Sequence, residues 1–177
     1  MQVIAVAVKK EYNEIEKFNK NDEENMTLIG IIAFLDPPKK DAKKTIQKLK
    51  KLGITTKVLT GDNPYASENI CNFVGIDGEI LLGQDIEKMS DKKLKEVVEK
   101  INIFARMNPI QKERVVKALK KNGHVVGYMG DGVNDAPSLH TADVGICVNT
   151  ATDIAKEASD IILLEKSLKV IFNGVIE

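Results

Sequence analysis

Short apolar segments alternate along the chain with longer segments that are apolar on one side only. The short segments are rich in Val and Ile, which is typical of strands buried on both faces of a parallel sheet. We expect strands at Val3–Val8, Leu28–Leu35, Thr56–Leu59, Ile103–Ala105, Val125–Met129, Val144–Val148 and Ile161–Leu164. Amphipathic segments between buried strands predict an α/β fold, a mostly parallel sheet with helices on both faces.

The amphipathic segments carry local helix signals. Lys39–Leu52 repeats apolar residues at helical spacing, and Pro109–Lys121 opens with a proline, which suits the first turn of a helix. Ser90 is a candidate N-cap for a helix over Asp91–Lys100. The last residues, 166–177, also have helical spacing.

The same patterns predict four parts of the chain. Residues 1–10 form a strand, and residues 11–27 form a linker, because EYNEIEKFNKNDEENMT is polar and has no clear period. Residues 28–165 form the main body. Residues 166–177 begin a helix that has no Gly or Pro terminator, so we expect it to continue.

Composition narrows the classes of function. The 177 residues contain 26 Lys and Arg and 26 Asp and Glu, so the formal net charge of zero gives no indication of nucleic-acid binding. No apolar run reaches the roughly 20 residues of a membrane span and no secretory signal is evident, so we expect the chain as given to be soluble. Cys71 and Cys147 stand far apart, and we expect buried, reduced thiols.

Candidate chemistry follows three of the expected strands. In parallel sheets, ligands bind at the carboxyl ends of the strands. Thr60-Gly61-Asp62 follows the first of these strands, Arg106-Met107-Asn108-Pro109 leads from the second to Lys112, and Gly130-Asp131-Gly132 follows the third.

The first two groups each have two interpretations. Thr60 and Gly61 could donate hydrogen bonds to phosphoryl oxygens, or the Thr-Gly-Asp turn could simply cap the helix that begins at Pro64. Lys112 could direct an ammonium group at the same phosphate, or it could be an ordinary solvated charge on a helix.

The third group lies in the segment GYMGDGVNDAPS, residues 127–138. Asp135 could cap a helix that begins at Ala136, but capping does not explain Asp131, Asn134 and the two glycines together. Magnesium prefers carboxylate oxygens and retained water. We therefore predict a Mg²⁺ site beside a phosphate, formed by Asp131 with Asp135 or Asn134.

Together these motifs resemble the haloacid dehalogenase superfamily, and in particular the phosphorylation domain of P-type cation-transporting ATPases, most of all the magnesium-transporting branch. The resemblance is carried by LDPPK (Leu35–Lys39), TGDN (Thr60–Asn63), FARMNPIQKERVV (Phe104–Val116), MGDGVNDAPSL (Met129–Leu139), ADVGICV (Ala142–Val148) and KEASDIILLEKSL (Lys156–Leu168). The resemblance implies a Rossmann-like haloacid dehalogenase fold. It also implies that the parent protein carries this domain at the cytoplasmic face of the cell membrane.

The resemblance also implies residue roles. In such ATPases an aspartate is phosphorylated by ATP, and the equivalents of Thr60, Gly61 and Lys112 bind the phosphoryl group. The equivalent of Asp131 coordinates Mg²⁺, and those of Asn134 and Asp135 organise the ion and the phosphate. Asp36 and Asp62 match positions that place the nucleotide, although Asp36 could equally be a strand end stopped by two prolines.

The family's phosphorylated aspartate has no counterpart here. It opens Asp-Lys-Thr-Gly-Thr, or Asp-x-Asp in soluble relatives, and no aspartate of the chain begins either pattern. The chain thus resembles the C-terminal part of a phosphorylation domain that lacks its central nucleophile strand, with residues 2–8 like the end of the nucleotide domain. Because covalent catalysis needs an acceptor atom, we expect the isolated chain to be inactive.

Two consequences and one alternative remain open. Gln2–Lys10, from the same chain or from a second copy in a strand-exchanged homodimer, could fill the vacant central position, or Val3–Val8 could pair at a sheet edge. The expected partners are the nucleotide, actuator and transmembrane domains of the parent ATPase. The alternative is a stand-alone, non-catalytic protein of the same fold that binds magnesium or phosphate, or a partner.

Overall fold

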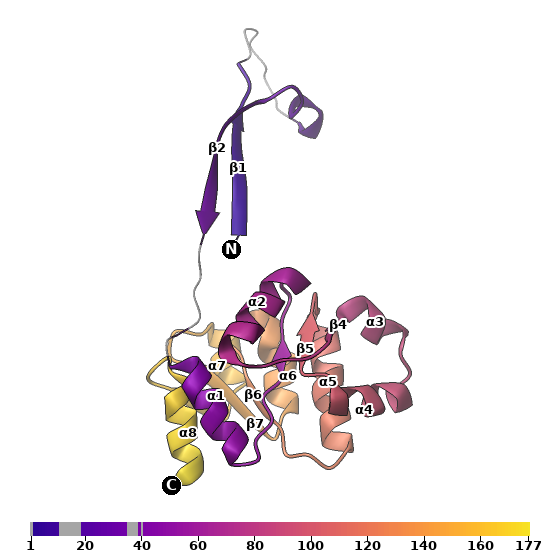
Figure 1. Ribbon diagram of the computed structural model, residues 1–177, viewed down its shortest axis with the longest axis vertical. Coiled ribbons are helices and arrows are strands. Elements are labelled where there is room, and N and C mark those ends of the chain that lie inside the picture. The colour runs from indigo at the N-terminus through magenta and orange to yellow at the C-terminus, as the bar shows by residue number, and fades with distance from the viewer. Residues whose placement is uncertain (1, 11–18, 35–38, 40) are drawn as a thin grey trace. The chain divides into compact units, whose positions relative to one another are not determined.

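The computed structural model describes residues 2–10, 19–34, 39 and 41–177, and it divides into two compact units (Figure 1). Unit 1 is Met1–Pro37 and unit 2 is Pro38–Glu177. Asp36, a predicted nucleotide-placing residue, lies outside the described residues. The division falls after residue 37, whereas the sequence predicted that the main body begins at residue 28.

Unit 1 is built on a two-stranded antiparallel ribbon. Strand β1 (Gln2–Val8) pairs with β2 (Thr27–Phe34), and a short 3₁₀ helix, η1 (Lys20–Asp22), lies within the predicted linker. Many apolar side chains of the ribbon are exposed, including Ile29 and Ile31. Leu28–Leu35 was predicted as a strand of the parallel sheet; its described residues, 28–34, lie in β2, which pairs antiparallel with β1 and not with the parallel strands.

Unit 2 contains two parallel three-stranded sheets. The first has the order β3–β5–β4 and the second the order β6–β7–β8. The strands are β3 (Val58–Leu59), β4 (Ile80–Leu82), β5 (Ile103–Ala105), β6 (Gly127–Met129), β7 (Val144–Val148) and β8 (Ile161–Leu163). The predicted α/β class with parallel strands is confirmed, and β4 is a strand that the sequence pattern did not reveal.

Helices flank these strands (Figure 1). They are α1 (Ala42–Lys51), α2 (Pro64–Val74), α3 (Gly83–Lys88), α4 (Asp91–Lys100), α5 (Pro109–Lys121), α6 (Ala136–Thr141), α7 (Asp153–Glu157) and α8 (Leu168–Ile176), with a 3₁₀ turn, η2 (Val133–Asp135), before α6. Ser90 caps α4 as predicted: its side chain accepts a hydrogen bond from the Lys93 amide. None of the helices in the described residues is long and apolar enough to cross a bilayer.

Helix α5 joins the two sheets into one body. Its neighbouring residues Val115 and Val116 are both buried, but Val115 belongs to the core with Phe104 and Val116 to the core with Leu139. Leu59 packs against both cores. The position of α5, and of the residues at its first turn, is therefore fixed from two sides.

The two sheets are not paired with one another within the described residues. Strand β3 is at one edge of the first sheet and β6 at one edge of the second. The hypothesis that Gln2–Lys10 fills a central position between them is wrong, because β1 pairs with β2. Nothing in the described residues supports the strand-exchanged homodimer.

Both cysteines are free and buried, as predicted. Cys71 lies in the core formed by α1, α2 and β5, and Cys147 in the core around β7. Burial raises the pKa of the Cys71 thiol. These thiols therefore act as apolar filling.

Leu94 and Leu164 form a matched pair for testing the core. Leu94 is 1% exposed and packs on α5, whereas Leu164 is 81% exposed. We expect Leu94→Ala to lower the free energy of unfolding by about 2–5 kcal/mol through lost burial and a cavity. Leu164→Ala should change it by less than about 0.5 kcal/mol. Urea unfolding followed by circular dichroism measures both, and equal effects would contradict the placement of this core.

Candidate phosphoryl and metal site

Three loops meet around a hollow of ≈ 280 Å³ at the carboxyl ends of β3 and β6. Four predicted site residues line it: Thr60 after β3, Lys112 from α5, and Asp131 and Asp135 from the loop after β6. They are separated by up to 75 positions in sequence, from 60 to 135, and parallel strands bring them to one edge of the sheet.

The loop after β3 is held in place by the loop after β5. The Met107 amide donates to the Thr60 carbonyl at 2.9 Å, and the Arg106 amide donates to the Asp62 carbonyl at 2.9 Å. Arg106 adopts φ of 52°, a left-handed conformation that is uncommon for a residue other than glycine. The hydroxyl of Thr60 is thus presented to the hollow from a doubly tethered loop.

The Thr-Gly-Asp turn does not cap α2 through its own side chains. Asn63 is the N-cap, and its side chain accepts a hydrogen bond from the Ala66 amide at 2.9 Å. The Thr60 hydroxyl accepts instead from the Asp62 amide at 3.1 Å. Thr60-Gly61-Asp62 thus forms a turn before α2, as the simpler interpretation has it, but Asn63 and not the turn supplies the cap.

Lys112 is a buried charge. It follows the capping box at the start of α5, where Asn108 and Gln111 satisfy one another's amides. Its ammonium group lies 2.8 Å from Asp135 Oδ1, and the two side chains are 11% and 14% exposed. A lysine on a solvated helix face would not be enclosed in this way, so that interpretation of Lys112 is wrong.

Asp135 accepts hydrogen bonds from four groups. Oδ1 accepts from Lys112 Nζ at 2.8 Å and from the Tyr128 hydroxyl at 2.9 Å, and Oδ2 accepts from the amides of Asp131 and Gly132 at 3.3 Å each. Its side chain makes no capping bond to α6. The carboxylate lines the hollow, closes the first turn of η2 through the Gly132 amide, and does not cap α6.

Electrostatics keep this carboxylate ionised. Burial raises the pKa of Asp135, but the hydrogen bond and charge of Lys112, with smaller contributions from Tyr128 and the Gly132 amide, outweigh it and hold the pKa below 3.8. Because the folded-state pKa is depressed, the associated stability is present above the unfolded value and is lost as the pH falls through the folded one.

Asp131 is the more open of the two carboxylates. Its Oδ2 lies 3.6 Å from Lys166 Nζ, and its carbonyl accepts from the Thr152 amide, which ties the loop to the start of α7. Each carboxylate of the pair is thus compensated by one lysine, Asp131 by Lys166 and Asp135 by Lys112.

This donor set fits Mg²⁺. The ion takes oxygen ligands and keeps several waters, so one or two carboxylates in an open hollow suffice. Among the described residues there is no cluster of three or more His, Cys, Asp or Glu side chains that would suit a more fully protein-coordinated metal. Asp131 and Asp135 would hold the ion here, and their present lysine partners would be free to turn toward an anion.

Three other predicted residues lie beside the hollow but do not line it. Gly61 and Asp62 are exposed on the loop after β3, next to Thr60. Asn134 is exposed within η2. The structure brings Thr60, Lys112, Asp131 and Asp135 together around one space, whereas Gly61, Asp62 and Asn134 are not among the residues that line it.

Two polar residues of the hollow, Tyr128 and Lys166, were not predicted from the sequence. Tyr128 was counted only as part of an apolar strand, although a hydroxyl directed into a core signals a polar partner. Lys166 stands out in no way among the chain's Lys and Arg residues. Its role is visible only once β8 brings it toward Asp131.

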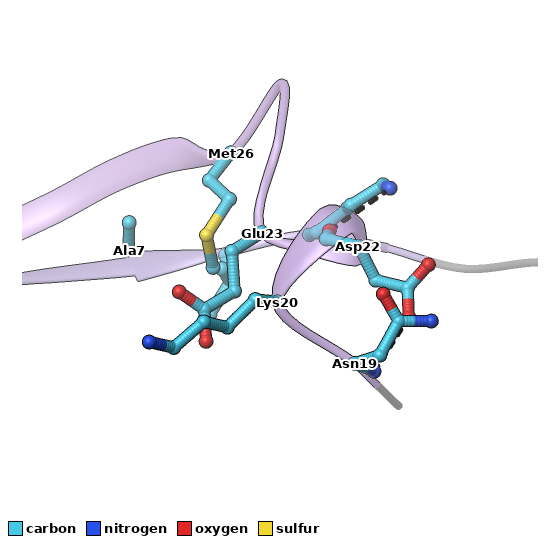
Figure 2. A pocket seen from close by; sticks show the side chains of 8 residues that line it. Ala7, Asn19, Lys20, Asp22, Glu23 and Met26 are labelled. Atoms are coloured by element: carbon cyan, nitrogen blue, oxygen red, sulfur yellow. Dashed lines mark hydrogen bonds between the residues drawn. The ribbon is translucent and has the colours of Figure 1, made fainter. Parts of the chain in front are cut away.

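A second hollow, of ≈ 500 Å³, lies in unit 1 (Figure 2). It is lined by Ala7, Val8, Lys9, Asn19, Lys20, Asp22, Glu23 and Met26. Asp22 and Asn19 are occupied with one another in the capping box of η1, as the dashed lines show. None of the described residues that the sequence predicted for a site lines this hollow, so the site in unit 2 is the functional candidate.

A hydroxyl, a buried lysine and two carboxylates thus lie together at the ends of parallel strands. Residues 4–143 match the haloacid dehalogenase-like hydrolases, and the chain belongs to this family. It is 50% identical over 178 residues to the magnesium-transporting ATPase, P-type 1, of Escherichia coli K12, an alignment that covers 100% of this chain and 20% of that protein.

Other matches agree with this assignment. The chain is 38% identical over 172 residues to calcium-transporting ATPase 1 of Bacillus cereus, covering 95% of this chain and 19% of that one. A solved catalytic domain of the CPx-ATPase CopB-B has the same fold, with a TM-score of 0.62, 24% identity, and coverage of 86% and 48%. The predicted resemblance to P-type cation-transporting ATPases, most of all the magnesium-transporting branch, is confirmed. The chain spans about a fifth of the length of these ATPases.

Lys112 provides a test of the buried ion pair. Lys112→Met leaves the largely buried Asp135 carboxylate without its main partner, and we expect the free energy of unfolding at pH 7 to fall by roughly 3 kcal/mol. Lys117→Met, on the same helix but with its exposed pair to Glu113, should cost less than about 1 kcal/mol. Chemical denaturation measures both, and a small effect at Lys112 would contradict the pairing.

Gly130 tests how tightly the loop is built around Asp135. A Cβ at residue 130 would collide with Cβ and Cγ of Asp135, so we expect Gly130→Ala to displace that side chain and to cost about 1–3 kcal/mol. Gly174→Ala, in α8 with nothing within 4 Å, should be neutral or stabilising by up to about 1 kcal/mol. Thermal unfolding of both variants checks the opposite signs.

Proposed function

We propose that this chain is part of the phosphorylation domain of a P-type ATPase that couples ATP hydrolysis, through an aspartyl-phosphate, to the transport of magnesium. The observation that carries the proposal is the convergence of Thr60, Lys112, Asp131 and Asp135 on one hollow. Identity of 50% over the whole chain to a magnesium-transporting ATPase supports the choice of ion.

Each residue then has a task during phosphoryl transfer. The Thr60 hydroxyl and the Gly61 amide donate to phosphoryl oxygens, and Lys112 turns its ammonium group from Asp135 to the same oxygens. Asp131 and Asp135 hold Mg²⁺, with Asn134 at the rim of its water shell. The bound ion would offset the charge that develops on the transferred group.

The acceptor carboxylate would come from sequence that this chain does not contain. Strands β3 and β6 are edge strands whose ends both lead into the hollow. A strand between them would deliver an aspartate to the position that Thr60, Lys112 and Asp131 surround. Without it, the 177 residues bind or orient a phosphate but form no covalent intermediate.

The remaining parts of the ATPase are the proposed partners. The exposed apolar ribbon of unit 1 is suited to a larger sheet, since a two-stranded ribbon is marginally stable on its own. We assign it to the nucleotide domain, and we assign residues 166–177 to a helix that leads toward the transmembrane domain. Asp36 and, on the loop after β3 in unit 2, Asp62 would help to place ATP. Both units would work at the cytoplasmic face of the membrane.

A chimera tests this function. The corresponding 178 residues of the Escherichia coli relative are replaced by this chain, and phosphoenzyme formed from radioactive ATP is measured after acid quenching. We expect Mg²⁺-dependent labelling, and a loss of at least about 100-fold on Asp131→Ala, in line with the loss of a metal ligand. Asp153→Ala, which removes a 96% exposed carboxylate, is the matched control and should label normally.

The 177-residue chain by itself completes the test. We expect no acid-stable label on it, because it offers no acceptor. An unlabelled chimera whose membrane insertion and fold are intact would instead favour the alternative, a non-catalytic protein of the same fold that binds magnesium or phosphate. Labelling of the isolated chain would overturn the proposed absence of an acceptor.

A further inference from the structure

Tyr128 presents a buried hydroxyl to the site. The residue lies in the middle of β6, is 8% exposed, and packs in the core with Val116 and Leu139. Its hydroxyl donates to Asp135 Oδ1 at 2.9 Å. The direction of this bond is fixed, because an ionised carboxylate only accepts and a phenol keeps its proton near neutral pH.

The hydroxyl is not needed to fill the core. A phenylalanine ring would bury the same apolar surface without taking a polar atom out of water, a transfer that costs free energy unless the atom is hydrogen-bonded. The bond to Asp135 compensates that cost. A second buried hydroxyl, Ser138 Oγ, has no hydrogen-bond partner within the described residues, yet it lies close enough to the phenol to interact with it.

The two oxygens of Asp135 are held very differently as a result. Oδ1 receives both strong donors, Lys112 at 2.8 Å and Tyr128 at 2.9 Å, whereas Oδ2 receives two backbone amides at 3.3 Å. If Lys112 turns toward a phosphate, Tyr128 is the side chain that still holds Oδ1. With Lys112 turned away, the phenol and the two backbone amides are the groups left to hold the carboxylate.

We propose that Tyr128 is a positioning residue that locks the Asp135 carboxylate by holding Oδ1, and so directs Oδ2 toward the metal beside Asp131. The role of the metal rests on the proposed function, but the locking of Asp135 does not. Hydrogen-bonding groups behind metal ligands orient those ligands, and their loss typically weakens metal affinity by roughly 10-fold to 100-fold.

The test compares Tyr128→Phe with Tyr65→Phe in the 177-residue chain. Tyr65 is 78% exposed on α2 and serves as the matched control. Three-bond scalar couplings to the Asp135 Cβ protons report its χ1 rotamers. Mn²⁺ binding, followed by electron paramagnetic resonance, reports metal affinity. We expect one Asp135 rotamer in the unaltered chain and in Tyr65→Phe, but rotamer averaging and at least about 10-fold weaker Mn²⁺ binding in Tyr128→Phe.

The outcomes separate the two proposals. Rotamer averaging in Tyr128→Phe, with no Mn²⁺ binding to the unaltered chain, would support the locking and count against the metal site. An unchanged single rotamer together with unchanged Mn²⁺ affinity would overturn the positioning role. A measurement on the unaltered chain avoids the risk that a variant misfolds. A Tyr128 hydroxyl proton that lies close to Asp135 and exchanges slowly with water would support the positioning role. A rapidly exchanging proton would contradict it.

Discussion

The ion pair between Lys112 and Asp135 is the interaction on which the site depends. It joins the first turn of α5 to the loop after β6, so it ties together elements that the two sheets supply separately. A half-buried charge is tolerated only when it is paired and hydrogen-bonded. Tyr128 and the amides of Asp131 and Gly132 complete that requirement. Without these partners, the negative charge of the Asp135 carboxylate would be buried and uncompensated. The same partners hold the carboxylate in one place.

The same arrangement explains how the site can change state. In the structure each carboxylate has a lysine partner, Lys112 for Asp135 and Lys166 for Asp131. A bound divalent cation would neutralise the negative charge of the two carboxylates. A bound phosphoryl group would neutralise the positive charge of the two lysines. Charge is thus balanced before and after ligands bind, and the exchange needs only rotations of long side chains.

Much of the fold followed from the sequence. Short Val- and Ile-rich segments predicted most strands, because parallel strands that are buried on both faces are apolar. Ser90, as an N-cap, and Pro109, in a first turn, indicated where two helices begin. Strand β4 was not predicted; its three apolar residues lead directly into α3 at Gly83 with no connecting loop. Residues of β1 and β2 were predicted as strands, but their pairing into a separate ribbon was not. In sequence, an exposed apolar strand resembles a buried one.

Site residues that belong to sequence motifs could be predicted. Site residues whose position depends on tertiary packing could not. Thr60, Asp131 and Asp135 follow strands, and such ends meet at one edge of a sheet, so their convergence could be expected. The burial of Lys112 could not, because it depends on how α5 is fixed between two cores. Tyr128 and Lys166 likewise acquire their partners only in three dimensions.

In our proposal, the 177 residues already carry the assembled metal side of a phosphoryl-transfer site. Paramagnetic broadening by Mn²⁺ in ¹H–¹⁵N spectra of the chain tests it residue by residue. The account predicts that the amides of residues 130–132 and of Thr60 broaden first, because they border the hollow. Broadening that begins elsewhere, such as at the exposed pair of Glu99 and His124, or that spreads evenly over the surface, would contradict it.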